Sequence, residues 1–183
     1  MKPLRIRKEE AILVLIDFQE RLMPAMKGSE ELEEATVKLV KGCRILGVPI
    51  LVTQQYTKGL GPTIPSIHDA IGEYEPIEKT AFSAMGEPVF VEKLKESKRK
   101  TVILAGIESH VCVLQTALDL IEEGYTVFLV NDCVASRSNS DKKYAQRRIA
   151  ESGAVGTTYE SVLFELLGGA RQEGFKDISA LVK

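Results

Sequence analysis

Three side chains of different chemistry each follow a segment whose residues are typical of a strand or its end. Asp17 closes the apolar run Ala11–Ile16, and Lys79 follows a short segment that ends in Ile-Glu. Cys112 lies shortly after the apolar run Thr101–Ala105, where a helix should begin. A carboxylate, an ammonium and a thiol are the groups that a hydrolase with an activated cysteine requires. The chain is therefore a candidate for nucleophilic catalysis.

The three cysteines of the chain differ in their surroundings. Cys43 lies on the apolar stripe of an expected helix and Cys133 at the end of an expected strand, which are typical positions for core residues. Cys112 is expected in the first turn of a helix, where unpaired N–H groups and the helix dipole favour a thiolate. This position alone supports a core role and a catalytic role about equally, and the accompanying Asp17 and Lys79 make Cys112 our predicted nucleophile.

Apolar runs alternate with amphipathic stretches along the chain. The runs lack in/out alternation, which is typical of parallel strands buried on both faces. They cover residues 11–16, 49–53, 101–105, 125–130 and 154–157. The expected helices between and after them cover residues 32–46, the stretch after 109, 141–152 and 161–167. This order predicts a three-layer α/β/α fold with a doubly wound, mainly parallel sheet, whose ligands bind beyond the carboxyl ends of the strands.

Length and composition limit the class of protein. At 183 residues the chain fits one domain, residues 1–183, with a sizeable core. A net charge of −2 gives no reason to expect nucleic acid or a membrane as a partner. The polar start shows no secretory signal, and an odd number of cysteines without Cys-x-x-Cys spacing argues against a disulfide framework. We expect a reducing, cytoplasmic location.

Three segments carry a resemblance to a known family. Leu15–Gln19, Glu78–Thr80 and Gly106–Cys112 resemble the signature stretches of the isochorismatase-like cysteine hydrolases, over roughly residues 10–165. That superfamily includes nicotinamidases, N-carbamoylsarcosine amidases and isochorismatases. The segment Gln54–Thr63 is most similar to the isochorismatase domain-containing branch. The resemblance implies that Asp17 moves the proton while an inward-pointing Lys79 stabilises both negative charges.

The resemblance also implies a special turn before Cys112. It implies a cis peptide bond between Ile107 and Glu108, which is costly for a residue other than proline. The N–H groups of Glu108 and Cys112 would then form an oxyanion hole for a tetrahedral intermediate.

Nicotinamidases hold a metal ion with an Asp-x-His motif after the second strand. Here Gln55 and Thr57 stand at those two positions. Neutral amides and hydroxyls are poor ligands for zinc, so we expect neither a metal nor another cofactor. A small-molecule substrate needs a partly apolar pocket with a few polar groups. Our candidate substrate-binding residues are Phe18, Gln54, Gln55, Tyr56, Phe82 and His110.

The preferred interpretation is hydrolysis of a small amide or related C–N carbonyl compound through a thioester on Cys112. One alternative is hydrolysis of a vinyl ether, with Asp17 as the acid and Cys112 as a bystander. Another is a non-enzymatic binding or scaffold protein. The resemblance implies a homo-oligomer, a dimer or larger, in each case.

Overall fold

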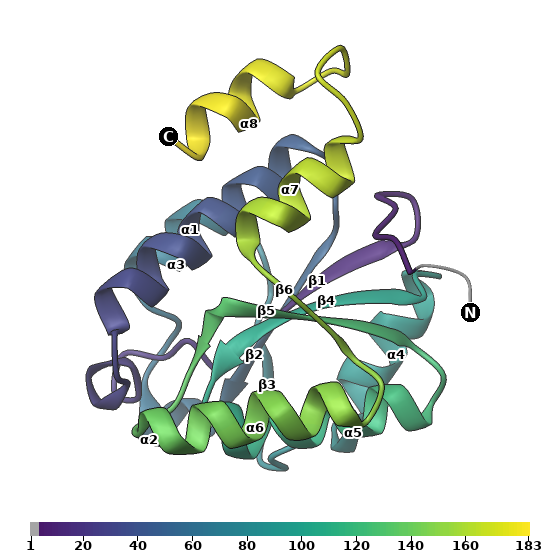
Figure 1. Ribbon diagram of the computed structural model, residues 1–183. Helices are drawn as coiled ribbons and strands as arrows, with labels where there is room; N and C mark the ends of the chain where they lie inside the picture. The colour runs from purple at the N-terminus through teal and green to yellow at the C-terminus, as the bar shows by residue number, and fades with distance from the viewer. Residues whose placement is uncertain (1–3) are drawn as a thin grey trace.

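The computed structural model describes residues 4–183. Six strands among them form one wholly parallel sheet (Figure 1). The strands are β1 (Ala11–Ile16), β2 (Ile50–Gln55), β3 (Ile77–Lys79), β4 (Thr101–Ile107), β5 (Thr126–Ala135) and β6 (Val155–Thr157). They follow one another across the sheet in the order β3-β2-β1-β4-β5-β6. The order changes direction between β1 and β4. This confirms the predicted doubly wound sheet and places its switch point between those strands.

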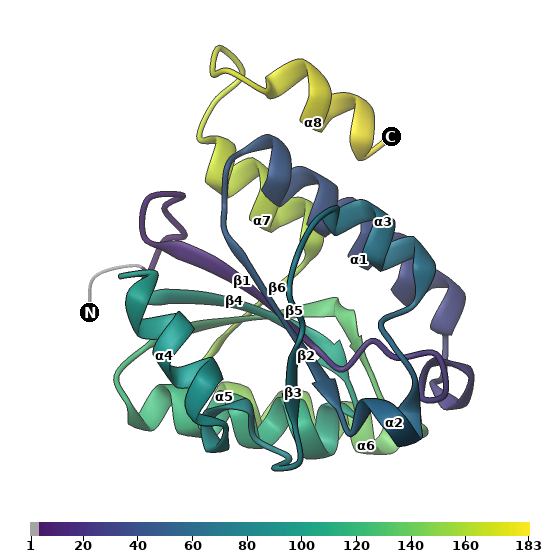
Figure 2. The same cartoon turned by 180° about the vertical axis from the view of Figure 1, so that it is seen from behind.

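Helices cover both faces of the sheet (Figures 1 and 2). On one face lie α1 (Ser29–Ile45), α3 (Pro65–Ile71), α7 (Tyr159–Leu167) and α8 (Phe175–Leu181), and on the other lie α4 (Pro88–Glu96), α5 (Leu114–Glu122) and α6 (Asn139–Glu151). The remaining turns of helix are η1 (Met23–Ala25), α2 (Thr57–Leu60), η2 (Ala84–Gly86) and η3 (Ser109–Val113). The three-layer prediction is thereby confirmed. No helix within residues 4–183 is both long and apolar enough to cross a membrane.

The central strands are apolar along their whole length because helices cover them on both sides. Every residue of β1 and of β4 is buried, as expected for parallel strands between two helical layers. The five predicted strands are all present, and β2, β4 and β5 run further toward their carboxyl ends than the apolar runs suggested. β3 was not among them, since it has three residues and only Ile77 is apolar.

β1 and β4 meet closely at the switch point. Gly106 pairs with Ile16 in the parallel register. A β-carbon at Gly106 would lie 2.6 Å from the β-carbon of Ile16 and 2.9 Å from both its carbonyl oxygen and a methyl carbon of Val113. The absence of a side chain therefore lets η3 pack directly over the ends of the two central strands.

Candidate active site

Asp17 lies directly after β1, at the carboxyl edge of the sheet. Its backbone is left-handed, with a φ of 58°. That conformation costs about 1–2 kcal/mol for most residues, and aspartate adopts it more readily than most. The side chain is 1% exposed. A strained, buried carboxylate at a strand end is maintained by its surroundings, as residues at functional sites often are.

Lys79 ends β3, and its ammonium is surrounded by oxygen atoms. Nζ donates to Asp17 Oδ2 at 2.7 Å and to Gln55 Oε1 at 2.6 Å. The carbonyl oxygens of Phe82 and Ala81 lie 3.1 and 3.3 Å from the same nitrogen. The side chain has no exposed surface, so the prediction that Lys79 points inward is confirmed. A buried ion pair is tolerated when its remaining hydrogen-bonding groups are satisfied in this way.

β2 lies between β1 and β3 and contacts both charges through neutral side chains. Thr53 Oγ1 donates to Asp17 Oδ1 at 2.7 Å, while Gln55 accepts from Lys79. Residues two apart on a strand point to the same face, so one strand can serve both neighbours. Thr53 was not among the predicted site residues. The signal that could have identified it is its spacing of two from Gln55 at the end of a strand.

Cys112 follows β4 within η3, which is a π-helical turn. Such turns are rare and occur frequently at functional sites. The pKa of the Cys112 thiol is raised to about 12, mainly by burial and also by the charge of Asp17, while the charge of Lys79 opposes this rise. Both charged groups therefore act on the thiol at short range. The structure brings the three predicted residues together at the switch point of the sheet.

The position of Cys112 near a helix start favours a thiolate, but the pKa of its thiol is raised and not lowered. A thiol with a pKa of about 12 is protonated at neutral pH. Burial outweighs the favourable position near a helix start, as it does at Cys43, whose pKa burial also raises to about 12. Rapid attack on a substrate carbonyl at neutral pH is consequently favoured by a base that takes the thiol proton, and Asp17 is the carboxylate beside Cys112.

The predicted cis peptide bond between Ile107 and Glu108 is also wrong. Residues 4–183 contain no cis peptide bond, and Glu108 reverses the chain in a left-handed conformation, with φ 53° and ψ 56°. A left-handed residue costs about 1–2 kcal/mol, whereas a non-proline cis bond costs about 3–4 kcal/mol. The turn is held by Ser109 Oγ, which donates to the Ala135 carbonyl at 2.7 Å.

A cluster of polar side chains surrounds this turn. Glu108 Oε1 lies 3.0 Å from Arg137 Nε, and Glu108 Oε2 lies 3.5 Å from His110 Nδ1. The same ring nitrogen is 3.0 Å from Ser136 Oγ. His110, a candidate for substrate contact, is thus engaged by protein groups at Nδ1. Arg137 was not predicted, and no motif in its segment would have indicated it.

Two of the candidate substrate-binding residues have no surface for that role. Phe18 is 1% exposed and packs in the core between the sheet and α1. Gln54 is buried, and its amide donates to Thr63 Oγ1 at 2.9 Å and accepts from Thr57 Oγ1 at 3.1 Å. These two expectations are wrong because the left-handed Asp17 turns the following residue inward and because successive residues of β2 point to opposite faces.

Tyr56 and Phe82 remain candidates for substrate contact. Their side chains are 53% and 54% exposed. Both belong to segments that contact Lys79, since the Tyr56 N–H donates to the Lys79 carbonyl at 3.0 Å and the Phe82 carbonyl accepts from Nζ. Two exposed aromatic rings beside a buried ion pair suit a small, partly apolar ligand. Their role stays a prediction.

The segment that corresponds to the nicotinamidase metal site does not fit a metal ion. Gln55 Oε1 already accepts from the Lys79 ammonium at 2.6 Å, and a second cation would be repelled there. Thr57 Oγ1 donates its proton to Gln54. Within residues 4–183, no three or more His, Cys, Asp or Glu side chains converge as a metal site would require.

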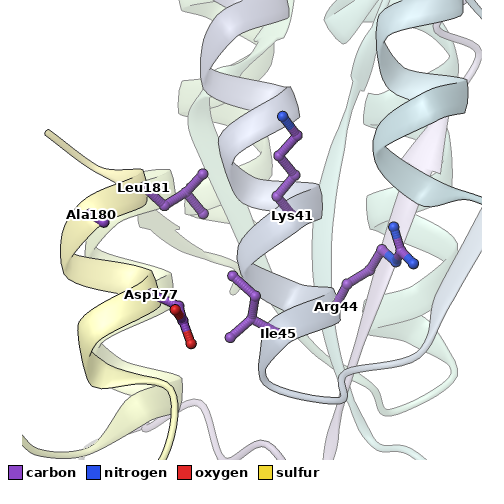
Figure 3. A pocket seen from close by; sticks show the side chains of 6 residues that line it. All are labelled: Lys41, Arg44, Ile45, Asp177, Ala180 and Leu181. Carbon is purple, nitrogen blue, oxygen red and sulfur yellow. The ribbon is translucent and has the colours of Figure 1, made fainter.

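A hollow of about 620 Å³ lies elsewhere, between α1 and α8 (Figure 3). It is lined by Lys41, Arg44, Ile45, Asp177, Ala180 and Leu181. It contains none of the three predicted catalytic residues. Its size alone is therefore no guide to the chemistry of this protein.

Comparisons with known proteins agree with the fold. The model of the isochorismatase domain family matches residues 11–161. Isochorismatase domain-containing protein 2 from Danio rerio is 38% identical over 97% of this chain and 89% of its own length. A structure from Caenorhabditis elegans called MAR1 ribonuclease is 40% identical, with a TM-score of 0.92, over 98% of this chain and 92% of that one.

Two structures of proteins called YcaC are similar as well. The protein from Pseudomonas aeruginosa, solved with hexane-2,5-diol and covalent acrylamide, is 26% identical with a TM-score of 0.93, over 99% of this chain and 93% of that one. The protein from Escherichia coli, described as an octameric hydrolase of unknown specificity, is 27% identical with a TM-score of 0.90, over 99% of this chain and 89% of that one.

Proposed function

This chain belongs to the isochorismatase family, and from that membership we propose that it is a metal-independent cysteine hydrolase. It would cleave a small amide or related C–N carbonyl compound through a thioester on Cys112. The observation that carries the proposal is the fully buried pair of Asp17 and Lys79, 2.7 Å apart, whose charges both act on the Cys112 thiol. Packing alone does not require a carboxylate, a cation and a thiol at one strand edge.

The proposed reaction begins with proton transfer from the thiol. Asp17 takes the proton as Cys112 Sγ bonds to the carbonyl carbon, and the carbonyl electrons move to the oxygen. The Cys112 N–H remains the proposed donor to that oxygen. The C–N bond then breaks, and Asp17 gives the proton to the leaving nitrogen. Water attacks the thioester, its proton passes to Asp17, and the departing sulfur recovers it.

The raised pKa of Cys112 determines the timing of the first step. At a pKa of about 12 almost no thiolate exists at neutral pH, so the proton must leave as the sulfur attacks. The Lys79 ammonium lowers the pKa of Cys112 and so stabilises the negative charge that develops on the sulfur. It also holds Asp17 Oδ2 in place at 2.7 Å.

The relatives support parts of this proposal. The covalent acrylamide in the Pseudomonas protein is an electrophile of the kind that a nucleophilic thiol attacks. The octameric Escherichia protein supports our proposal that this chain, as one domain of residues 1–183, forms a homo-oligomer. The chain's three cysteines are free thiols, which supports a reducing, cytoplasmic compartment.

The test is detection of the acyl-enzyme. The full chain is incubated with a pool of small amides, and intact mass and peptide mapping are used to find an acyl adduct. We expect the adduct on Cys112 and none in Cys112→Ala. The name of the C. elegans relative makes RNA a necessary comparison. Cleavage of RNA oligonucleotides without any amide turnover would show that RNA, and not a small amide, is the substrate.

Vinyl-ether hydrolysis is a second candidate because one observation favours it. A thiol with a pKa of about 12 stays protonated at neutral pH, as expected of a residue that takes no part in the reaction. Asp17 would then protonate a vinyl carbon of the ether without help from Cys112. Under that alternative, Cys112→Ala keeps its turnover of vinyl ethers while Asp17→Asn loses it. A wild-type protein with no turnover of either class would favour the scaffold alternative.

A further inference from the structure

We propose that Gln55 is a positioning residue that holds the Lys79 ammonium on Asp17 beside the Cys112 thiol. Its catalytic meaning rests on the proposed function, whereas its effect on the thiol does not. Sequence patterns suggested that Gln55 contacts the substrate. Its hydrogen bonds point instead to a role within the protein, through Lys79.

The contacts of Lys79 leave a clear role for this glutamine. An ammonium has three hydrogens to donate, and four oxygen atoms lie within 3.3 Å of Nζ. Gln55 Oε1 is the nearest of them, at 2.6 Å, followed by Asp17 at 2.7 Å. The other two are carbonyls two and three residues further along the same segment. Asp17 and Gln55 are therefore the side chains that direct the ammonium across the strand ends.

The orientation of the Gln55 amide is determined by its own partners. Its Nε2 donates to the Thr80 carbonyl at 2.9 Å, which leaves Oε1 facing Lys79. Its backbone N–H donates to Gln19 Oε1 at 2.7 Å, and its carbonyl accepts from Gln19 Nε2 at 2.9 Å. Gln19 is fully buried and also donates to the Gly61 carbonyl at 2.7 Å. A chain of hydrogen bonds thus runs from Gln19 through Gln55 to Lys79.

The neutrality of this side chain matters as much as its position. Asp17 and Lys79 together carry no net charge, and a neutral acceptor leaves that balance unchanged. A carboxylate at position 55 would compete with Asp17 for the ammonium and add a negative charge to the site. A negative charge nearby disfavours a thiolate, so the thiol of Cys112 would then ionise less readily.

The test measures the rate at which iodoacetamide alkylates Cys112 in the full chain, by peptide mapping between pH 7 and 10. Gln55→Glu should slow alkylation about tenfold, which corresponds to a rise of one pKa unit. Gln55→Met removes the acceptor without adding charge and should slow it about threefold, because the ammonium is then less well held. Gln54→Glu is the matched control and should stay within about twofold of the wild type. It adds the same charge on the opposite face of β2, where two threonine hydroxyls can donate to it.

Thermal melting of each variant establishes that it is folded. Equal slowing by Gln54→Glu and Gln55→Glu would show that charge alone acts and would overturn the inference. An unchanged rate in both Gln55 variants would do the same. Slower alkylation in a protein that hydrolyses no amide would sustain the inference while the proposed function fails. Amide turnover with unaltered alkylation in the Gln55 variants would sustain the function and reject the inference.

Discussion

Cys112, at the carboxyl edge of the sheet, and Cys43, within α1 on one face of it, both have a thiol pKa of about 12. Burial is the largest cause at both positions. At Cys43 it is the whole cause, and the residue lies among the apolar side chains of the core. At Cys112 a carboxylate and an ammonium act on the thiol in opposite directions. The two thiols differ in their neighbours and not in their resting protonation.

The two regions also differ in what the fold tolerates. The strand edge holds a buried ion pair and three left-handed residues, Asp17, Tyr56 and Glu108. Cys43 lies in α1 within one cluster of buried apolar side chains. Left-handed residues and buried charges are unfavourable by themselves and are found mainly at functional sites. A buried thiol is therefore better judged by the charged groups around it than by its own burial.

The largest expected difference between the two regions is in turnover. Once an amide substrate is found, Cys112→Ala should lose all measurable thioester turnover. Cys43→Ala should retain turnover near the wild-type level, because no charged group accompanies that thiol. Steady-state kinetics on both variants measures the contrast. Near-normal amide turnover in Cys112→Ala would break the comparison.

Replacement of Lys79 should strongly destabilise the protein. Lys79→Met leaves Asp17 buried without its cation, and breaking such a pair costs about 3–5 kcal/mol in the free energy of unfolding. The exposed Lys41 of α1 provides a control, and Lys41→Met should change that free energy by no more than about 0.5 kcal/mol. Urea denaturation measures both. The double variant Asp17→Asn with Lys79→Met should recover part of the loss, and no recovery would argue that the pair is not coupled.

Asp17→Asn should move two properties of the protein in opposite directions. Turnover should fall by ~10²–10⁴ because the base is lost. Alkylation of Cys112 at neutral pH should become about tenfold faster, because the Asp17 charge raises the pKa of that thiol and its removal lowers it.

The pH dependence of Cys112 alkylation shows whether the Asp17 charge raises or lowers the pKa of the thiol. In the wild type, with a pKa of about 12, alkylation should rise about tenfold per pH unit from pH 7 to 10. In Asp17→Asn, the curve of Cys112 alkylation against pH should shift to lower pH. The corresponding curve for Cys43 should not move. Peptide mapping after timed alkylation separates the thiols. Slower labelling of Cys112 in Asp17→Asn would show that this charge does not act on it.

The smallest expected effects concern two glycines. Gly106→Ala places a β-carbon 2.9 Å from the backbone oxygen of Ile16, which cannot move without distorting the sheet, so we expect a loss of about 1–3 kcal/mol. Gly42→Ala meets only the flexible end of Leu163, and alanine is favoured over glycine within a helix by about 0.5–1 kcal/mol. The net loss of stability in Gly42→Ala should therefore be smaller than that in Gly106→Ala. Thermal melting compares them, and a larger loss for Gly42→Ala would contradict the more rigid packing of the strand edge.

Much of the fold could be predicted because burial on two faces leaves a simple pattern. The run Ala11–Ile16 is continuous and apolar, and it forms β1 with the predicted bounds. β3 has no such run, since Glu78 and Lys79 follow its single apolar residue, and only pairing with β2 makes it a strand. The short helices α2 and α3 occupy a segment rich in glycine and proline, where local propensity is a weak guide.

The sequence by itself determined which chemical groups are present and at which strand ends they stand. Asp17, Lys79 and Cys112 were predicted from their types, their positions after strands and the three motif segments. Parallel strands bring their carboxyl ends to one edge, which predicted that Asp17 and the segment of Cys112 lie close together. The inward position of Lys79 was implied by the family resemblance, because the strand that carries it has no apolar run.

Only the tertiary structure decided the state of those groups. The pKa of Cys112 depends on how deeply its surroundings bury it and on two charges that come from distant parts of the chain. The Lys79 ammonium donates to Gln55, which reaches it from a neighbouring strand. Local sequence carries no record of such contacts, because burial and electrostatic interactions are sums over atoms that only the folded chain brings together.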